Sequence, residues 1–203
     1  MSRERMNEFA SRAVVAALFT ALSINLLGDF LRTGRVTGLL LLASEALVVV
    51  LTIVRRPASL VDRTLVAATM TSISIGAPAM LRSVDTGGLI PDTATALFSA
   101  VGLTLIIAGK MTLGRSFGIA PANRGVVARG PYNVVRHPIY AGYVITHVAF
   151  LVAHPRPWNL AVVAVADTAL VVRALIEEHL LVADDEYAAY CRRVGWHLVP
   201  GVF

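Results

Sequence analysis

The sequence predicts an all-α protein, a polytopic bundle of about six transmembrane helices followed by a C-terminal amphipathic helix. Of its 203 residues, 56% are hydrophobic and only 15% are charged, whereas a soluble domain carries about 25% charged residues. The apolar residues gather in segments close to the roughly 20 residues with which a helix crosses a bilayer core. The length suits one membrane domain, residues 1–203, and not two.

Six apolar segments are expected to be the spans. The first follows three arginines, as a secretory signal would, but it is longer than a signal core and five further segments come after it. The fifth begins at Pro138, and proline is favoured in the first turn of a helix. The segments cover residues 13–31, 36–54, 64–81, 93–109, 138–153 and 158–175, so that residues 1–109 hold four spans and residues 110–203 hold two.

The distribution of basic residues predicts the orientation. Of the 18 Lys and Arg residues, 14 fall on one side of this topology and four on the other, namely Arg32, Arg35, Arg82 and Arg156. Because basic residues are enriched in cytoplasmic connections, we expect both termini in the cytoplasm. The 110–137 connection, including Lys110, and the tail would lie on that same side.

The tail after residue 175 has the apolar spacing of an amphipathic helix lying on the bundle or on the headgroups. It is expected to end at Pro200-Gly201. The single cysteine excludes a disulfide framework or a thiolate metal site within one chain. The apolar stripe consists of Ile176, Leu180, Ala183, Tyr187, Cys191 and Val194.

The run Arg136-His137-Pro138-x-Tyr140-x-Gly142 is the first polar cluster. Free backbone N–H groups at a helix start attract an anion, and Arg136 and His137 add donors there. The Tyr140 ring suits a cation, and Gly142 allows a ligand or helix to approach closely. A zwitterion with a positive sulfur, such as S-adenosylmethionine, matches this pattern. Alternatively, Arg136 marks the membrane boundary and His137 only caps the helix.

The second cluster, Glu177-Glu178, closes the last span. Carboxylates there oppose the helix dipole and are placed to accept an ammonium group. Alternatively, Arg173 and Glu177 form an i,i+4 ion pair while Glu178 is solvated. Facing inward, Arg173 would hold an anionic substrate group. The sequence leaves the roles of three further polar residues of the spans open, namely Asp167, Glu45 and His147.

In combination, the motifs of residues 110–203 resemble the isoprenylcysteine carboxyl methyltransferase and phospholipid methyltransferase group, in the form of a prokaryotic integral membrane member. A P-loop, a zinc-type helix motif and a GxGxxG fingerprint after a strand are absent from the sequence, so no metal is predicted. The matching residues are Leu113-Gly114-Arg115, Gly130-Pro131-Tyr132, Val135 to Pro138 with Tyr140 and Gly142, Arg173 with Glu177-Glu178, and Glu186-Tyr187 with Tyr190.

The resemblance implies an S-adenosylmethionine-dependent methyltransferase in the prokaryotic cytoplasmic membrane, with its active site facing the cytoplasm. Residues 110–203 would be the catalytic half. Arg173, near the methyl acceptor, and His137 would be catalytic. The cofactor would be bound by Tyr132, Arg136, His137, Tyr140, Gly142, Glu177 and Glu178.

The expected partners are membrane lipids and a lipophilic or lipid-linked acceptor, such as an isoprenylcysteine-type carboxylate, and no nucleic acid. A phospholipid amine or a small thiol is an alternative acceptor. Two other classes stay open: a membrane NADPH-dependent reductase of the steroid-reductase type, and a non-enzymatic scaffold that keeps the fold. The sequence does not indicate the oligomeric state.

Overall fold

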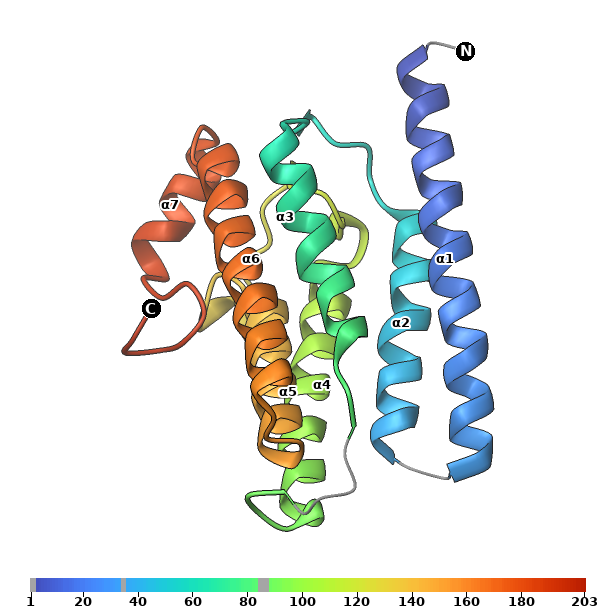
Figure 1. Ribbon diagram of the computed structural model, residues 1–203. Coiled ribbons are helices and arrows are strands. Elements are labelled where there is room, and N and C mark those ends of the chain that lie inside the picture. The colour runs from blue at the N-terminus through green and yellow to red at the C-terminus, as the bar shows by residue number, and fades with distance from the viewer. Residues whose placement is uncertain (1–2, 34–35, 84–87) are drawn as a thin grey trace.

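The computed structural model describes residues 3–33, 36–83 and 88–203, and this part of the chain is all-α, as predicted (Figure 1). Two short strands pair antiparallel, and three 3-10 turns cover Ala77–Met80, Gly114–Ser116 and Gly130–Asn133. The helices and strands are α1 (Arg3–Thr33), α2 (Val36–Val54), β1 (Leu60–Val61), α3 (Leu65–Gly76), α4 (Asp92–Leu113), β2 (Ala122–Asn123), α5 (Pro138–Ala153), α6 (Pro157–Leu181) and α7 (Asp185–Arg193).

Several helix ends differ from the predicted ones for local reasons. The third apolar segment is α-helical only to Gly76 and continues as a 3-10 turn, because Pro78 lacks the N–H of an α-helical bond. The fourth runs on past residue 109 and ends at Leu113, because the next residue, Gly114, has a φ of 51°, a backbone conformation that glycine adopts readily. The sixth continues through the two glutamates to Leu181.

The tail does not form the single helix to Pro200-Gly201 that was predicted. It breaks after α6, and Asp184 starts α7 by accepting a hydrogen bond from the Glu186 N–H at 3.0 Å. Helix α7 ends at Arg193, and the chain then turns back toward the start of α5. The helix breaks here because the Asp184 carboxylate accepts a hydrogen bond from a nearby backbone N–H group, which favours a helix start at this residue over a continuous helix.

Helices α4 and α5 pack backbone to backbone near the middle of the molecule. A Cβ placed on Gly142 would lie 2.7 Å from the Gly102 carbonyl oxygen and 2.6 Å from Cγ1 of Ile106. Ile106 is fully buried in the main hydrophobic core. Figure 1 shows α1 and α2 as a separate pair beside α3 to α6, with α7 on the opposite side.

The β1–β2 pair ties the α2–α3 connection to the segment that follows α4. Leu60 pairs with Asn123, and the Asn123 side chain donates a hydrogen bond to Asp184 at 2.9 Å. The strands therefore link residues near 60 to the start of α7. This link closes one end of the bundle, where α4 ends, α5 begins and α6 ends.

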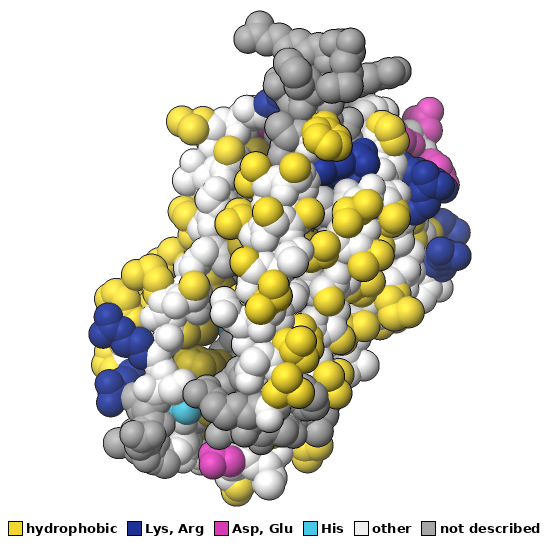
Figure 2. Space-filling view, turned by 90° about the vertical axis from the view of Figure 1, so that its right-hand side faces the viewer, with side chains coloured by type: hydrophobic (Ala, Val, Ile, Leu, Met, Phe, Trp, Pro, Cys, Tyr) yellow, Lys and Arg dark blue, Asp and Glu magenta, His cyan; other side chains and the backbone are white. Residues whose placement is uncertain are grey.

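Two described helices are long and apolar enough to cross a bilayer, residues 92–116 and 157–181, and four others are apolar but shorter. The prediction of six spans is therefore not confirmed. Figure 2 shows hydrophobic side chains over much of one face, with Lys and Arg gathered toward its two ends. That pattern fits a membrane-embedded surface.

One residue in the predicted cytoplasmic connection lies elsewhere. Lys110 belongs to α4, is fully buried, and donates hydrogen bonds to the Ser44 carbonyl at 3.0 Å and hydroxyl at 2.8 Å. Its ammonium lies 3.7 Å from a Glu45 carboxylate oxygen. Lys110 therefore does not count toward the orientation, and Arg35, used in the same comparison, lies outside the described residues.

Candidate functional site

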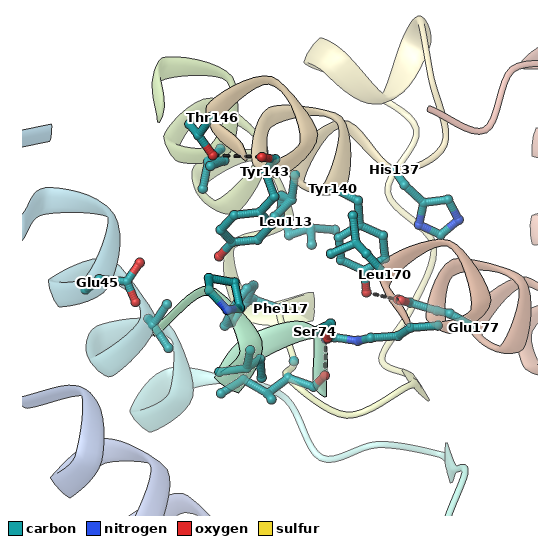
Figure 3. Close-up of a pocket in the computed structure, with 18 of the residues that line it drawn as sticks. Glu45, Ser74, Leu113, Phe117, His137, Tyr140, Tyr143, Thr146, Leu170 and Glu177 are labelled. Carbon is teal, nitrogen blue, oxygen red and sulfur yellow. Dashed lines mark hydrogen bonds between the residues drawn. The ribbon is translucent and has the colours of Figure 1, made fainter. Parts of the chain in front are cut away.

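A cavity of about 830 Å³ runs through the bundle, and the predicted polar residues other than Glu178 line one end of it. Figure 3 shows His137, Tyr140 and Glu177 at that end and Glu45 at the opposite end, with Leu113, Phe117 and Leu170 between them. The cavity thus has polar groups at two separate places along a largely apolar wall.

Glu178 joins the two clusters that the sequence placed about forty residues apart. Its carboxylate accepts from the Arg136 guanidinium at 2.7 Å and lies 2.9 Å from Nε2 of His137. Nδ1 of His197, in the tail, lies 2.6 Å from the same carboxylate. The alternative that Glu178 is merely solvated is therefore wrong, because three neighbours already hold this carboxylate.

Arg136 is held by hydrogen bonds to α6, to α7 and to the residue that follows α7. Its guanidinium also donates to the carbonyl oxygens of Val194 at 2.8 Å and Cys191 at 3.1 Å. Burial by itself lowers the pKa of Arg136, but the hydrogen bond and charge of Glu178 outweigh it, so the pKa lies above its usual value. Arg136 therefore stays charged and joins α6 to the C-terminal part of the chain. The alternative that it only marks the membrane boundary does not account for these contacts.

Glu177, by contrast, faces the cavity. Its carboxylate accepts a hydrogen bond from the Tyr140 hydroxyl at 2.8 Å. The alternative of an i,i+4 ion pair with Arg173 is wrong, since the described residues show none between those two side chains. Glu177 is thus a carboxylate on the cavity wall without a cationic partner among the described side chains.

Arg173 lies inward, as the functional interpretation required, and is 7% exposed. It donates to the Ser74 hydroxyl at 3.4 Å and to the Ile119 carbonyl. Its Nε is buried and has no hydrogen-bond partner among the described residues. A buried guanidinium with an unused donor can bind an anionic group that enters the cavity.

The Tyr140 ring already has neighbours. The His137 ring stacks on it with centroids 5.1 Å apart, and the Arg173 guanidinium lies 5.2 Å from its centroid. Buried Tyr132 also lines the cavity, and burial, followed by the Glu177 charge, raises the pKa of Tyr132 well above its usual value. The Tyr132 hydroxyl therefore stays neutral at this end.

The remaining site residue, Gly142, lies at the α4–α5 contact and is not among the residues that line the cavity. Its missing side chain is used for helix packing, which is one of the two uses that the sequence suggested. It supports the site by holding α5 close to α4.

The structure adds His197 and Tyr143 to the candidate site, and the sequence analysis named neither for it. The role of His197 carried no sequence signal, because it depends on how the tail folds back. Tyr143 could have been found, since Tyr140, Tyr143 and His147 recur at helical spacing, and all three line the cavity. Among the described residues, no group of three or more His, Cys, Asp or Glu side chains could hold a metal ion.

Comparison with known proteins gives one family match. The family model described as phospholipid methyltransferase matches residues 92–184, and no curated protein matches the chain significantly. The match supports a membrane methyltransferase in general and does not favour the reductase alternative. The matched residues 92–184 include both polar clusters, so the resemblance to phospholipid methyltransferases that the motifs predicted is confirmed for this part of the chain.

Proposed function

We propose that the chain is an integral membrane methyltransferase that binds S-adenosylmethionine at the polar end of the cavity and methylates a lipophilic acceptor. The observation that carries the proposal is that Glu178 binds both Arg136 and His137, and that these two residues line the same cavity as Glu177. When bound, S-adenosylmethionine supplies an activated methyl group on a positively charged sulfur.

The residues present fit such a donor in their charges. Glu177 offers a carboxylate for its ammonium group, and Arg173 offers an unused buried N–H for an anionic group. Glu178 does not line the cavity, so its task is to hold Arg136 and His137 in place. This division assigns donor binding to Glu177 and organisation of the site to Glu178.

The apolar remainder of the cavity supports a lipophilic acceptor. It extends from the polar end to residues of α1 and α2, such as Phe19, Leu22 and Leu41. Such a wall favours hydrocarbon over a soluble substrate. A phospholipid amine is the first acceptor to test, because the family description names phospholipids, followed by an isoprenylcysteine-type carboxylate and a small thiol.

Membrane placement completes the proposal. The chain would form a single membrane domain with six spans, both termini in the cytoplasm and the site at the cytoplasmic face of a prokaryotic membrane. Residues 110–203 would be the catalytic half. The gathering of Lys and Arg toward two ends of the apolar face supports only the embedding of that face in a bilayer, and the proposed orientation depends on the unequal distribution of basic residues in the sequence.

The test is equilibrium binding of radiolabelled S-adenosylmethionine and, separately, of NADPH to the detergent-purified chain. We expect saturable binding of S-adenosylmethionine that Glu177→Gln weakens, and no binding of NADPH. Glu186→Gln, an exposed change on α7, is the matched control and should bind like the wild type. Binding of NADPH alone, or of neither compound, contradicts the proposal, and the second outcome favours a non-enzymatic scaffold.

A further inference from the structure

A second polar group lies on the α5 wall of the cavity, beyond the motif residues. Tyr140, Tyr143 and His147 share one face of α5, and all three line the cavity. At a rise of about 1.5 Å per residue, His147 lies roughly 10 Å along the helix axis from Tyr140. The ring of Tyr143 stacks against that of His147, with centroids 6.4 Å apart.

His147 is oriented by a carboxylate from the neighbouring helix. Its Nδ1 lies 2.6 Å from Oδ1 of Asp167 on α6, and the two side chains are 9% and 21% exposed. An ionised carboxylate can only accept, so in the neutral ring the proton sits on Nδ1. Nε2 then carries the lone pair and is the basic nitrogen.

The basic nitrogen of His147 is not fully enclosed by the described residues. No described residue forms a hydrogen bond with Nε2 of His147, and this atom is not among the fully buried side-chain atoms that lack a partner. His147 also lines the cavity, and the proposal below requires that a polar molecule approach Nε2 from there. Proton transfer needs this kind of access, because donor and acceptor atoms must come within about 3 Å.

His137 is the rival base, and its surroundings differ. The carboxylate beside it, Glu178, also binds the positive Arg136 and lies against His197. Among the described residues, His147 is the ionic partner of Asp167, with no arginine or lysine sharing that carboxylate. The Glu178 carboxylate is thus shared among three side chains, whereas Asp167 orients the His147 ring without a second ion-pair partner among the described residues.

We propose that His147 accepts the proton of a nitrogen or sulfur nucleophile in the methyl acceptor, and that Asp167 is its positioning residue. This inference rests on the proposed function. The nucleophile loses its proton to Nε2, and the imidazolium is stabilised by Asp167. The freed lone pair forms the bond to the methyl carbon as the carbon–sulfur bond breaks, and that electron pair stays on sulfur, giving a neutral thioether.

The need for a base at His147 depends on whether the methyl acceptor carries a proton on its attacking atom. An ammonium group or a thiol must lose a proton before it can attack, whereas a carboxylate is already ionised at neutral pH. Changes at His147 should therefore slow methylation of amines and thiols and leave methylation of a carboxylate nearly unchanged. A merely structural contact between α5 and α6 would affect every acceptor alike.

The first experiment uses the full chain in detergent micelles with methyl-labelled S-adenosylmethionine. The acceptors are a phosphatidylethanolamine, an alkyl thiol and a farnesylcysteine carboxylate. For the amine or thiol, His147→Gln should lower kcat about 10²- to 10⁴-fold, the usual share of general acid–base catalysis, with donor binding within about twofold. Asp167→Asn, which keeps a hydrogen-bonding group but loses the charge, should lower kcat less. His179→Gln, an exposed histidine of α6, is the control.

The second experiment does not depend on turnover. Nitrogen-15 NMR of histidine-labelled protein, assigned with His147→Gln, should show the neutral His147 ring protonated at Nδ1 in the wild type. A proton on Nε2 overturns the proposal. Equal loss for all acceptors, or an amine reaction indifferent to His147→Gln, also overturns it while leaving the proposed function intact. Failure of the wild type to bind S-adenosylmethionine removes the proposed function itself.

Discussion

Glu178→Gln is expected to destabilise the fold, whereas Glu177→Gln is expected to weaken donor binding. Glu178 holds Arg136 at 2.7 Å and His137 at 2.9 Å, and its side chain is 12% exposed. Removing one partner of a buried ion pair costs about 3–5 kcal/mol. Because glutamine keeps one acceptor and the pair is not fully enclosed, we expect a loss of about 2–3 kcal/mol in the free energy of unfolding.

Glu177→Gln leaves the fold nearly intact, because an amide oxygen still accepts from the Tyr140 hydroxyl, which now lies 2.8 Å from the carboxylate. The expected change in the free energy of unfolding is below about 1 kcal/mol. The lost charge matters for binding instead. A charge-assisted hydrogen bond contributes about 1.5–3 kcal/mol, so the Kd for S-adenosylmethionine should rise roughly 10- to 100-fold.

Both variants are measured by two assays, denaturant unfolding in mixed micelles and equilibrium binding of radiolabelled S-adenosylmethionine. Glu186→Gln on the exposed face of α7 controls for the loss of one negative charge. The division of roles is refuted if Glu177→Gln binds the donor as the wild type does. It is equally refuted if Glu178→Gln unfolds no more easily than Glu177→Gln.

Two further perturbations test the packing that holds the site. Gly142→Ala places a Cβ 2.6 Å from Ile106 and should destabilise the bundle by about 1–3 kcal/mol in denaturant unfolding. Gly28→Ala, with nothing within 4 Å, should be neutral or slightly stabilising, and equal losses would contradict this account. Lys110→Met strands the buried Glu45 carboxylate now 3.7 Å from the ammonium and should cost about 3–5 kcal/mol. The double variant Lys110→Met with Glu45→Gln should recover part of that loss, because it no longer leaves an unpaired buried charge. If it recovers none, the ion pair between Lys110 and Glu45 does not account for the stability lost in Lys110→Met.

The helices were largely predictable because each depends on neighbours in the sequence. Residues 138–153 form a helix with the predicted bounds, since Pro138 suits a first helical turn and the apolar run supports the rest. The fourth span was predicted too short, because a lysine at position 110 suggests a membrane boundary, whereas in the fold Lys110 is buried beside Glu45. The tail was predicted too long, because its break depends on Asp184.

The site was predictable as a set of residues but not as a set of roles. Arg136, His137 and Tyr140 form hydrogen bonds with the two glutamates. The predicted topology placed both clusters on the same side of the membrane, so this contact was expected. Which glutamate faces the cavity could not be predicted, because neighbouring residues on a helix point about 100° apart and the sequence does not say which direction is inward.

By itself, the sequence determined that this protein is helical, that its helices are strongly apolar, and that its polar chemistry is concentrated at two clusters, because helix formation and hydropathy follow from local residue order. Only the tertiary structure decided that Glu178 is bound by three side chains while Glu177 faces the cavity, and that His147 meets Asp167. The physical reason is that these contacts join separate helices, or a helix and the tail, and their energies depend on side-chain direction and burial, which exist only once the helices have packed.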